Sequence, residues 1–203
     1  DELVALLNKQ NSTRDRYASI TFDDGYADNY TYAFPILKAS NASATIFVCT
    51  GFINQEIDIA AKYQTYHGLA ALTWEQIHEM AGCGVTPAAH THSHFKLTSI
   101  PLTTVDEEIS KSKDILEYML HRSITGFAYP FGGTGSFDST TIDVIRKYNF
   151  RYACSAIWGR VSDKSNILAL PRIRIDPLDS MSDFMAKLTG RWEFIPHLQR
   201  LRF

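Results

Sequence analysis

Apolar residues recur along the chain in two alternating patterns, short continuous runs and helically spaced stripes. The runs predict six strands, at residues 17–22, 43–49, 85–90, 124–129, 152–156 and 169–175. Between them lie segments whose apolar residues recur every three or four positions, as on a helix with one buried face. Strands that alternate with helices indicate a parallel sheet, either open or closed into a barrel.

Capping residues predict where three of the helices begin. Thr73 and Thr104 each open a capping-box pattern, and Asp138 precedes a third apolar stripe. Behind Thr104, a stripe of apolar residues at helical spacing runs from Val105 to Leu120. We therefore expect helices to start just after each of these three residues.

Two prolines and one polar insertion modify this pattern. Pro35 lies inside the helical segment 29–39, so we expect a kink or a restart of the helix there. Pro87 weakens the third strand, because proline cannot donate to a sheet ladder. Residues 54–68 are polar and are expected to form a loop over one face.

Composition narrows the class of protein. The chain has 203 residues, 45% of them hydrophobic, and a net charge of −2, so it shows no basic excess that would indicate nucleic-acid binding. Its apolar stretches are shorter than the roughly 20 residues of a membrane-spanning helix. Cys49, Cys83 and Cys154 are too few and too scattered for a disulfide framework, and we expect free thiols. The chain begins with Asp1, which indicates a fragment or a processed product.

Chemistry-bearing residues follow three of the predicted strands. The segment 90–94 reads HTHSH, and a curled loop would let His90 and His94 point at one metal ion, although such a cluster also arises by chance. Asp23 and Asp24 end the first strand, where the ordinary alternative is a solvated Asp-Gly turn. Residues 129–133 follow the fourth strand. In parallel α/β folds these strand ends meet on one face, where active sites form.

One carboxylate and two imidazoles suit Zn²⁺ with an open coordination position, and they also suit Fe²⁺ or Co²⁺. Such an ion lowers the pKa of water to about 7 and polarises a carbonyl oxygen. The second aspartate would be free to act as a base. The pattern thus indicates metal-assisted hydrolysis of an amide or an ester.

Residues 21–26 (TFDDGY), 90–94 (HTHSH) and 129–132 (YPFG) resemble, in this order, the first three motifs of the polysaccharide deacetylases. These are carbohydrate esterase family 4, typified by the nodulation-type chitooligosaccharide deacetylases. The resemblance implies a single-domain α/β fold, a distorted (β/α) barrel with fewer than eight parallel strands. It also implies a divalent metal, usually zinc. We expect a lead-in at 1–16, the catalytic domain at 17–190, and a C-terminal helix or tail at 191–203.

Carried over residue by residue, the resemblance makes Asp23 the catalytic base and Asp24, His90 and His94 the metal ligands. Phe131 matches the aromatic position whose backbone N–H helps bind the oxyanion, and we assign Tyr129 of the same motif to the substrate side. Thr91 matches the hydroxyl that supports the histidine loop. His92 has no fixed role and is either a bystander or a substrate contact.

The chain departs from the family pattern in two places. Ala128 stands where an arginine often orients the catalytic aspartate, and we expect Arg172, in the run Leu-Pro-Arg-Ile, to reach Asp23 instead, at about 2.7–3.2 Å. The alternative is an arginine on a surface strand. The late Leu-x-His motif of the general acid is not found, because the context of His197 does not match, and Trp158 is a weak candidate for the preceding Trp motif.

The leading hypothesis is therefore a metal-dependent hydrolase that removes acetyl groups from an N-acetylated or O-acetylated saccharide, in polysaccharide biosynthesis or modification. One alternative is an amidohydrolase acting on small cyclic amides. Another is a non-catalytic saccharide-binding module that lacks the general acid. The sequence leaves the sugar, the oligomeric state and the compartment, bacterial envelope or cytoplasm, open.

Overall fold

The computed structural model describes residues 17–63 and 69–191, and within them a single six-stranded parallel sheet in the order β1-β2-β3-β4-β5-β6. The strands are β1 (Ile20–Phe22), β2 (Ala44–Val48), β3 (Val85–Ala89), β4 (Gly126–Ala128), β5 (Tyr152–Trp158) and β6 (Leu170–Arg172). All six predicted strands are present. The first, fourth and last are shorter than the predicted 17–22, 124–129 and 169–175.

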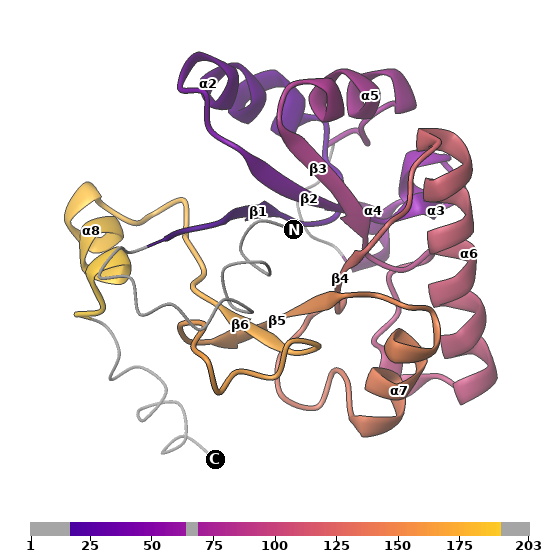
Figure 1. Ribbon diagram of the computed structural model, residues 1–203. Coiled ribbons are helices and arrows are strands. Elements are labelled where there is room, and N and C mark those ends of the chain that lie inside the picture. Colours follow the sequence, from indigo (N-terminus) through magenta and orange to yellow (C-terminus); the bar gives the residue numbers. More distant parts are fainter. Residues whose placement is uncertain (1–16, 64–68, 192–203) are drawn as a thin grey trace.

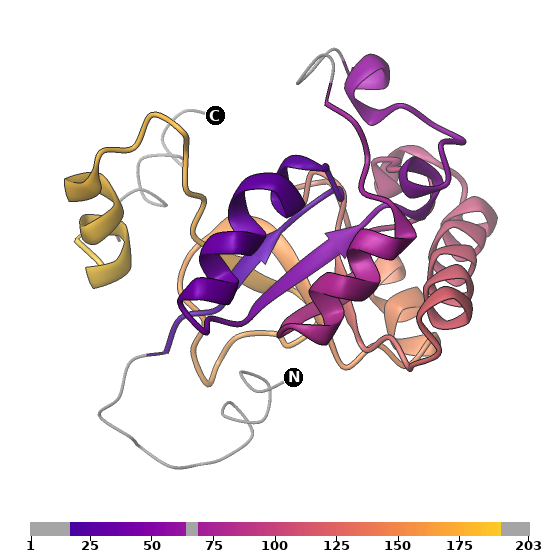
Figure 2. The same cartoon turned by 90° about the horizontal axis from the view of Figure 1, so that it is seen from above.

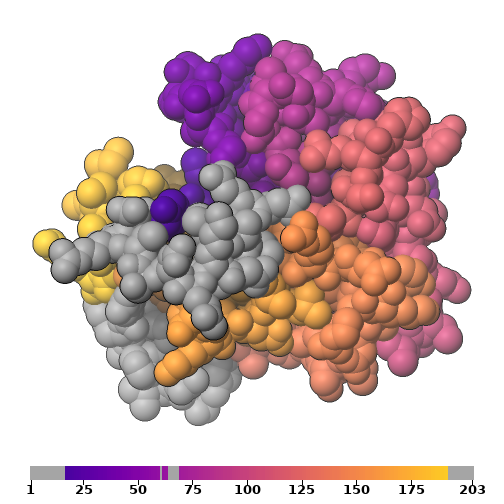
Figure 3. Space-filling view, viewed as in Figure 1, coloured from indigo at the N-terminus to yellow at the C-terminus, as the bar shows by residue number. Residues whose placement is uncertain are grey.

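The sheet curls into a half-barrel with the helices on its outside (Figure 1). The helical segments are η1 (Asn29–Ala33), α2 (Phe34–Ala39), α3 (Thr50–Ile53), α4 (Ile59–Tyr63), α5 (Trp74–Gly82), η2 (Leu97–Ser99), α6 (Leu102–Leu120), α7 (Ser139–Lys147) and α8 (Met181–Thr189). Figure 2 shows α2 and α5 side by side over one part of the sheet. In the space-filling view, α6 and α7 form one side of the molecule and α8 lies on the other (Figure 3). This is the predicted distorted barrel with fewer than eight strands.

Two hydrophobic clusters lie on the two faces of the sheet. On β2, Ile46 and Val48 face the helices, while Phe47 between them faces the inside of the curl together with Ala88 and Ala128. All of β2 is buried, which explains its continuous apolar sequence. Each fully buried large side chain contributes about 1.5–3 kcal/mol relative to exposure.

The capping predictions are confirmed for Thr73 and Asp138 and wrong for Thr104. Thr73 and Asp138 each form a reciprocal capping box. The long helix instead begins at Leu102, directly after Pro101, whose extended backbone (ψ 148°) marks the start of the helix without any side-chain cap. Thr104 therefore lies inside the first turn.

The prolines and the insertion have distinct outcomes. A π-helical turn over Asn29–Ala33 continues into α2 without leaving the helical backbone region, and Pro35 lies in the first turn of α2, so the helix changes type beside Pro35 and does not restart. Pro87 is tolerated in β3 because the β3–β4 pairing includes only Ala89, so most of β3 is laddered on one side alone. The expectation of a loop over residues 54–68 is wrong in part, since α4 lies within it. From residue 192 onward the predicted tail is outside the described residues.

No helix in the described part of the chain is long and apolar enough to cross a membrane. Cys49, Cys83 and Cys154 are all free, as expected.

Candidate metal centre and catalytic site

A tight turn places two carboxylates at the end of β1. Asp24 adopts a left-handed backbone (φ 72°), and the N–H of Gly25 donates to the carbonyl of Asp23 at 2.9 Å. The turn is therefore centred on Asp24, the residue before the glycine. Gly25 also has positive φ (93°), so a substitution there would strain the backbone, and a Cβ would press on Ile53 Cδ1 at 2.9 Å. The turn sends the neighbouring carboxylates to two different partners.

The histidine loop follows β3 directly. His90 and His94 are buried, and both Thr91 (φ 62°) and His94 (φ 55°) have positive φ, which non-glycine residues adopt reluctantly. The N–H of His94 donates to Thr91 Oγ1 at 3.1 Å. Thr91 therefore supports the loop, as the sequence predicts.

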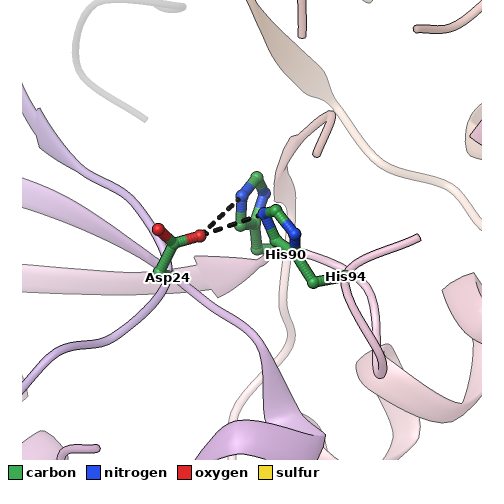
Figure 4. A group of neighbouring side chains, drawn as sticks. All are labelled: Asp24, His90 and His94. Atoms are coloured by element: carbon green, nitrogen blue, oxygen red, sulfur yellow. Dashed lines mark ion pairs between the residues drawn. The ribbon is translucent and has the colours of Figure 1, made fainter. Parts of the chain in front are cut away.

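Asp24, His90 and His94 converge on one point (Figure 4). The Oδ1 atom of Asp24 lies 3.3 Å from Nε2 of His90 and 3.1 Å from Nε2 of His94. Two ligands of a tetrahedral ion with bonds of about 2.1 Å lie about 3.4 Å apart. Both distances are therefore those expected between ligands of one ion, and all three ligand atoms lie within 4.8 Å of one another.

The hydrogen bonding around His90 favours a cation between its Nε2 atom and the carboxylate of Asp24. Its Nδ1 lies 2.7 Å from the carbonyl of Ala128, which can only accept, so Nδ1 carries a hydrogen. In the neutral ring, the lone pair of Nε2 then faces an oxygen of Asp24. That oxygen is buried and has no hydrogen-bond donor. A divalent cation resolves this arrangement, and the donor set fits one.

The pKa shifts of two of the three side chains, Asp24 and His94, favour the ionisation state that metal binding requires. Burial opposes the charge on Asp24, but the neighbouring imidazoles of His90 and His94 outweigh it and hold the pKa of Asp24 well below its usual range. Burial lowers the pKa of His94, which favours the neutral imidazole that binds metals. For His90, burial is outweighed by the nearby carboxylates of Asp24 and Asp23, and the pKa is raised.

Asp23 is held on the other side of the site by Arg172. The two guanidinium nitrogens Nη1 and Nη2 lie 2.7 Å from Oδ1 and Oδ2 of Asp23, so the pair is bidentate. Nη1 also lies 3.2 Å from Thr21 Oγ1. The predicted contact is confirmed. Burial opposes ionisation of Asp23, but the Arg172 charge outweighs it and lowers the Asp23 pKa.

This ion pair joins the two edges of the curled sheet, because Asp23 follows β1 and Arg172 ends β6. The two strands share no ladder in the described structure. An irregularity in the β5–β6 register between Cys154 and Trp158 leaves the carbonyl of Ser155 free to accept from Arg172 Nε at 2.7 Å. Bulges of this kind commonly re-aim a side chain beside an active site.

The two residues of the third motif have different environments. Phe131 is 47% exposed, has positive φ (62°), and its ring lies 5.1 Å from that of His94 and 5.2 Å from that of Tyr63. The structure corrects the assignment of Tyr129 to the substrate. Its side chain is buried, its hydroxyl donates to the carbonyl of Leu168, and its N–H donates to that of Cys154. Tyr129 is a core residue.

His92 points away from the metal group. Its ring lies 3.0 Å from Thr50 Oγ1 and 3.1 Å from Glu56 Oε2, so it anchors the loop to α3 and the segment after it. Sequence reasoning missed three residues that bond this loop, Lys62, Tyr63 and Glu108. Glu108 had a signal, since it is a charged residue on the apolar stripe of α6.

No general acid is assigned among the described residues. His78 bonds the carbonyl of Met119, and His121 ends α6 at the opposite end of the strands. Trp158 packs under the ammonium of Lys187, with the nitrogen 5.6 Å from the ring centre. His197 lies outside the described residues.

A sequence profile of the family described as polysaccharide deacetylase matches residues 10–153, well over half of the chain. The chain belongs to the polysaccharide deacetylase family. Metal dependence is typical of this family, in keeping with the group formed by Asp24, His90 and His94.

Two curated relatives illustrate the match. YxkH of Bacillus subtilis, whose own assignment as a polysaccharide deacetylase is provisional, is 30% identical over 185 residues, 91% of this chain and 61% of YxkH. The poly-β-1,6-N-acetyl-D-glucosamine N-deacetylase of Staphylococcus aureus is 28% identical over 183 residues, 86% of this chain and 58% of the enzyme. The chain thus spans about three fifths of the length of these relatives.

Solved structures share the fold. The Streptococcus pyogenes deacetylase PplD, in complex with acetate, has a TM-score of 0.79 and 28% identity, covering 92% of this chain and 76% of PplD. IcaB from Ammonifex degensii has a TM-score of 0.73 and 23% identity over 90% of this chain and 77% of IcaB, a similarity of fold alone.

Proposed function

We propose that this polysaccharide deacetylase family member removes acetyl groups from an N-acetylated saccharide, or from an O-acetylated one, with Zn²⁺ held by Asp24, His90 and His94. The observation that carries the proposal is that the carboxylates of two adjacent residues have different partners. Asp24 sits against two imidazoles at metal-ligand spacing, while Asp23 is held ionised by Arg172. The side chains of Asp23 and Asp24 are 34% and 23% exposed, so a substrate can reach both.

Each side chain has a defined task in this reaction. A bound divalent ion would supply Lewis-acid polarisation of the acetyl carbonyl and favour ionisation of water. Arg172 keeps the Asp23 carboxylate ionised and oriented, and Asp23 takes a proton from the attacking water. Asp23 then returns this proton to the departing amine or alcohol as its bond to the acetyl carbon breaks and acetate forms. The backbone N–H of Phe131 hydrogen-bonds the developing oxyanion. The half-exposed ring of Phe131 lies against His94 and covers one side of the site.

The substrate class follows from the family and from the Staphylococcus aureus relative, whose name specifies a β-1,6-linked N-acetylglucosamine polymer. We propose an N-acetylglucosamine oligomer as the first probe. The relatives are longer than this chain. The proposal therefore concerns the reaction at the described site, and the test uses this chain by itself.

The test incubates the Zn²⁺-loaded chain with β-1,6- and β-1,4-linked N-acetylglucosamine oligomers, with an O-acetylated oligosaccharide and, separately, with a cyclic amide, and measures acetate, free amine and ring opening. Acetate with an equal amount of amine supports N-deacetylation, and acetate without amine supports the ester reaction. Ring opening of a cyclic amide without acetate would favour the amidohydrolase alternative. Oligomer binding without any product would favour the binding module. Asp23→Asn serves as the inactive control.

A further inference from the structure

The backbone of the histidine loop is bonded on all sides by residues from neighbouring helices. The carbonyl of Thr91 accepts from the N–H of Thr50, and that of His92 accepts from the N–H of Gly51 at 2.8 Å. The carbonyl of Ser93 accepts from Lys62 Nζ at 2.8 Å. The hydroxyl of Tyr63 donates to the next carbonyl, that of His94. α3 and α4 thus satisfy the carbonyls.

The amides in the middle of the loop have a single shared acceptor, Glu108 of α6. Its Oε2 accepts the N–H of His92 at 3.1 Å and the N–H of Ser93 at 2.6 Å. These two amides lie midway between the proposed ligands His90 and His94. One carboxylate oxygen therefore fixes the segment that sets the separation of the two imidazoles.

The position of Glu108 is unfavourable unless these bonds are made. Its residue is only 7% exposed, and it lies on the buried stripe of α6 beside Val105 and Ile109. A buried carboxylate requires hydrogen-bond donors, and charge-assisted bonds are stronger than neutral ones. The loop in turn requires an external hold, because Thr91 and His94 both have positive φ.

We propose that Glu108 is a positioning residue that preorganises the histidine loop for metal binding by gripping the amides of His92 and Ser93. The inference rests on the metal site of the proposed function and adds a residue that acts through the loop, without touching metal or substrate. It predicts that the loss of this carboxylate weakens metal affinity even though all three ligands remain.

The first test measures the dissociation constant of Zn²⁺ by competition with a chromophoric chelator. Loss of a side chain that orients metal ligands typically weakens affinity by about 10–100-fold, and we expect this range for Glu108→Ala. Two variants on the same helix serve as controls: Glu107→Ala, at an exposed position, and Ser112→Ala, at a buried position without a bond to the loop. Both should stay within about threefold of the unmodified chain, since neither bonds the ligand-bearing loop.

The second test is amide hydrogen exchange of the metal-free protein, which reads the loop directly. Glu108→Ala should accelerate exchange in a peptide covering residues 90–95 and leave a peptide covering β2 unchanged. Glu108→Gln keeps an acceptor oxygen but loses the charge, so its affinity and its exchange should lie between those of the unmodified chain and Glu108→Ala. The absorption spectrum of the Co²⁺-loaded variants should change in the same order, because it reports ligand geometry.

Unchanged Zn²⁺ affinity and unchanged loop exchange in a folded Glu108→Ala variant would overturn the inference. If that variant does not fold, Glu108→Gln decides, and values equal to those of the unmodified chain would overturn it. Acetate release is measured separately. A chain that binds Zn²⁺ with the expected dependence on Glu108 but releases no acetate would support the inference and count against the proposed reaction alone. A chain without stoichiometric Zn²⁺ would overturn both.

Discussion

The two sides of the site are held in different ways. On the metal side, the histidine loop is buried, and its backbone is bonded by residues of α3, α4 and α6. On the other side, Asp23 depends on one side chain, Arg172, which reaches across two sheet edges that share no ladder. The ligand-bearing loop is thus fixed by many bonds, and the proposed base by a single guanidinium.

This difference separates metal binding from turnover. Bonds to the loop are partly redundant, because its successive carbonyls are bonded by different donors and that of His92 by two, so the removal of one donor leaves the others in place. The bonds to Asp23 are not redundant. Variants on the Arg172 side should therefore affect turnover and spare the metal, whereas only the ligands and the shared acceptor Glu108 should affect the metal strongly.

The largest effect is expected for His90→Ala. Removing one of three ligands should abolish stoichiometric Zn²⁺ and, with it, turnover, because the remaining two side chains cannot hold the ion. Metal content after dialysis, measured by mass spectrometry, checks this. His78→Ala, which changes a histidine on α5 remote from the loop, is the matched control. Full metal content in His90→Ala would remove this residue from the ligand set.

Asp23→Asn should separate the two sides most clearly. It keeps the shape of the side chain and the metal ligands but removes the proposed base, so turnover should fall by about 10²–10⁴-fold with unchanged Zn²⁺ content. Acetate release and metal analysis on the same sample check both halves. Loss of metal together with activity would instead make Asp23 a ligand.

Arg172→Met tests the single-guanidinium side. Turnover should fall by about 10²-fold, the scale of a misplaced catalytic group, while Zn²⁺ stays bound. Arg172 lowers the pKa of Asp23, so its removal should raise that pKa and move the acid limb of the kcat/KM profile to higher pH. Arg174→Met is the control, because the Arg174 side chain is exposed and its ion pair is with Asp176, at 3.6 Å. An unchanged profile in Arg172→Met would contradict the orienting role.

The smallest effect is expected for Cys49→Ala. Its thiol, whose pKa burial raises to about 12, donates to the carbonyl of His92 at 2.9 Å, but that carbonyl also accepts from Gly51. We expect a loss of about 1 kcal/mol in unfolding free energy for the one bond, measured by urea denaturation. Zn²⁺ affinity should change less than in Glu108→Ala. An effect as large as that of Glu108→Ala would mean that the loop bonds are not redundant.

Local signals carried most of the fold. The strands follow from short apolar runs, and the caps of α5 and α7 follow from Thr73 and Asp138, because a cap depends on residues only three positions apart. The predicted helix start at Thr104 was wrong because Pro101 allows the helix to begin earlier, at Leu102. The prediction of a loop over residues 54–68 was wrong in part, since α4 is a five-residue helix whose periodicity is too short to detect.

The sequence by itself determined the residues to which we assign the chemistry, since the carboxylate pair and the spaced histidines stand in compact motifs at the ends of apolar runs. It also indicated Arg172, because Ala128 left a charge partner missing. Only the tertiary structure decided the rest. The contact of Arg172 with Asp23 spans 149 positions and depends on how far the sheet curls. The burial of Tyr129 and the grip of Glu108 on the loop depend on packing between distant elements, which no local pattern specifies.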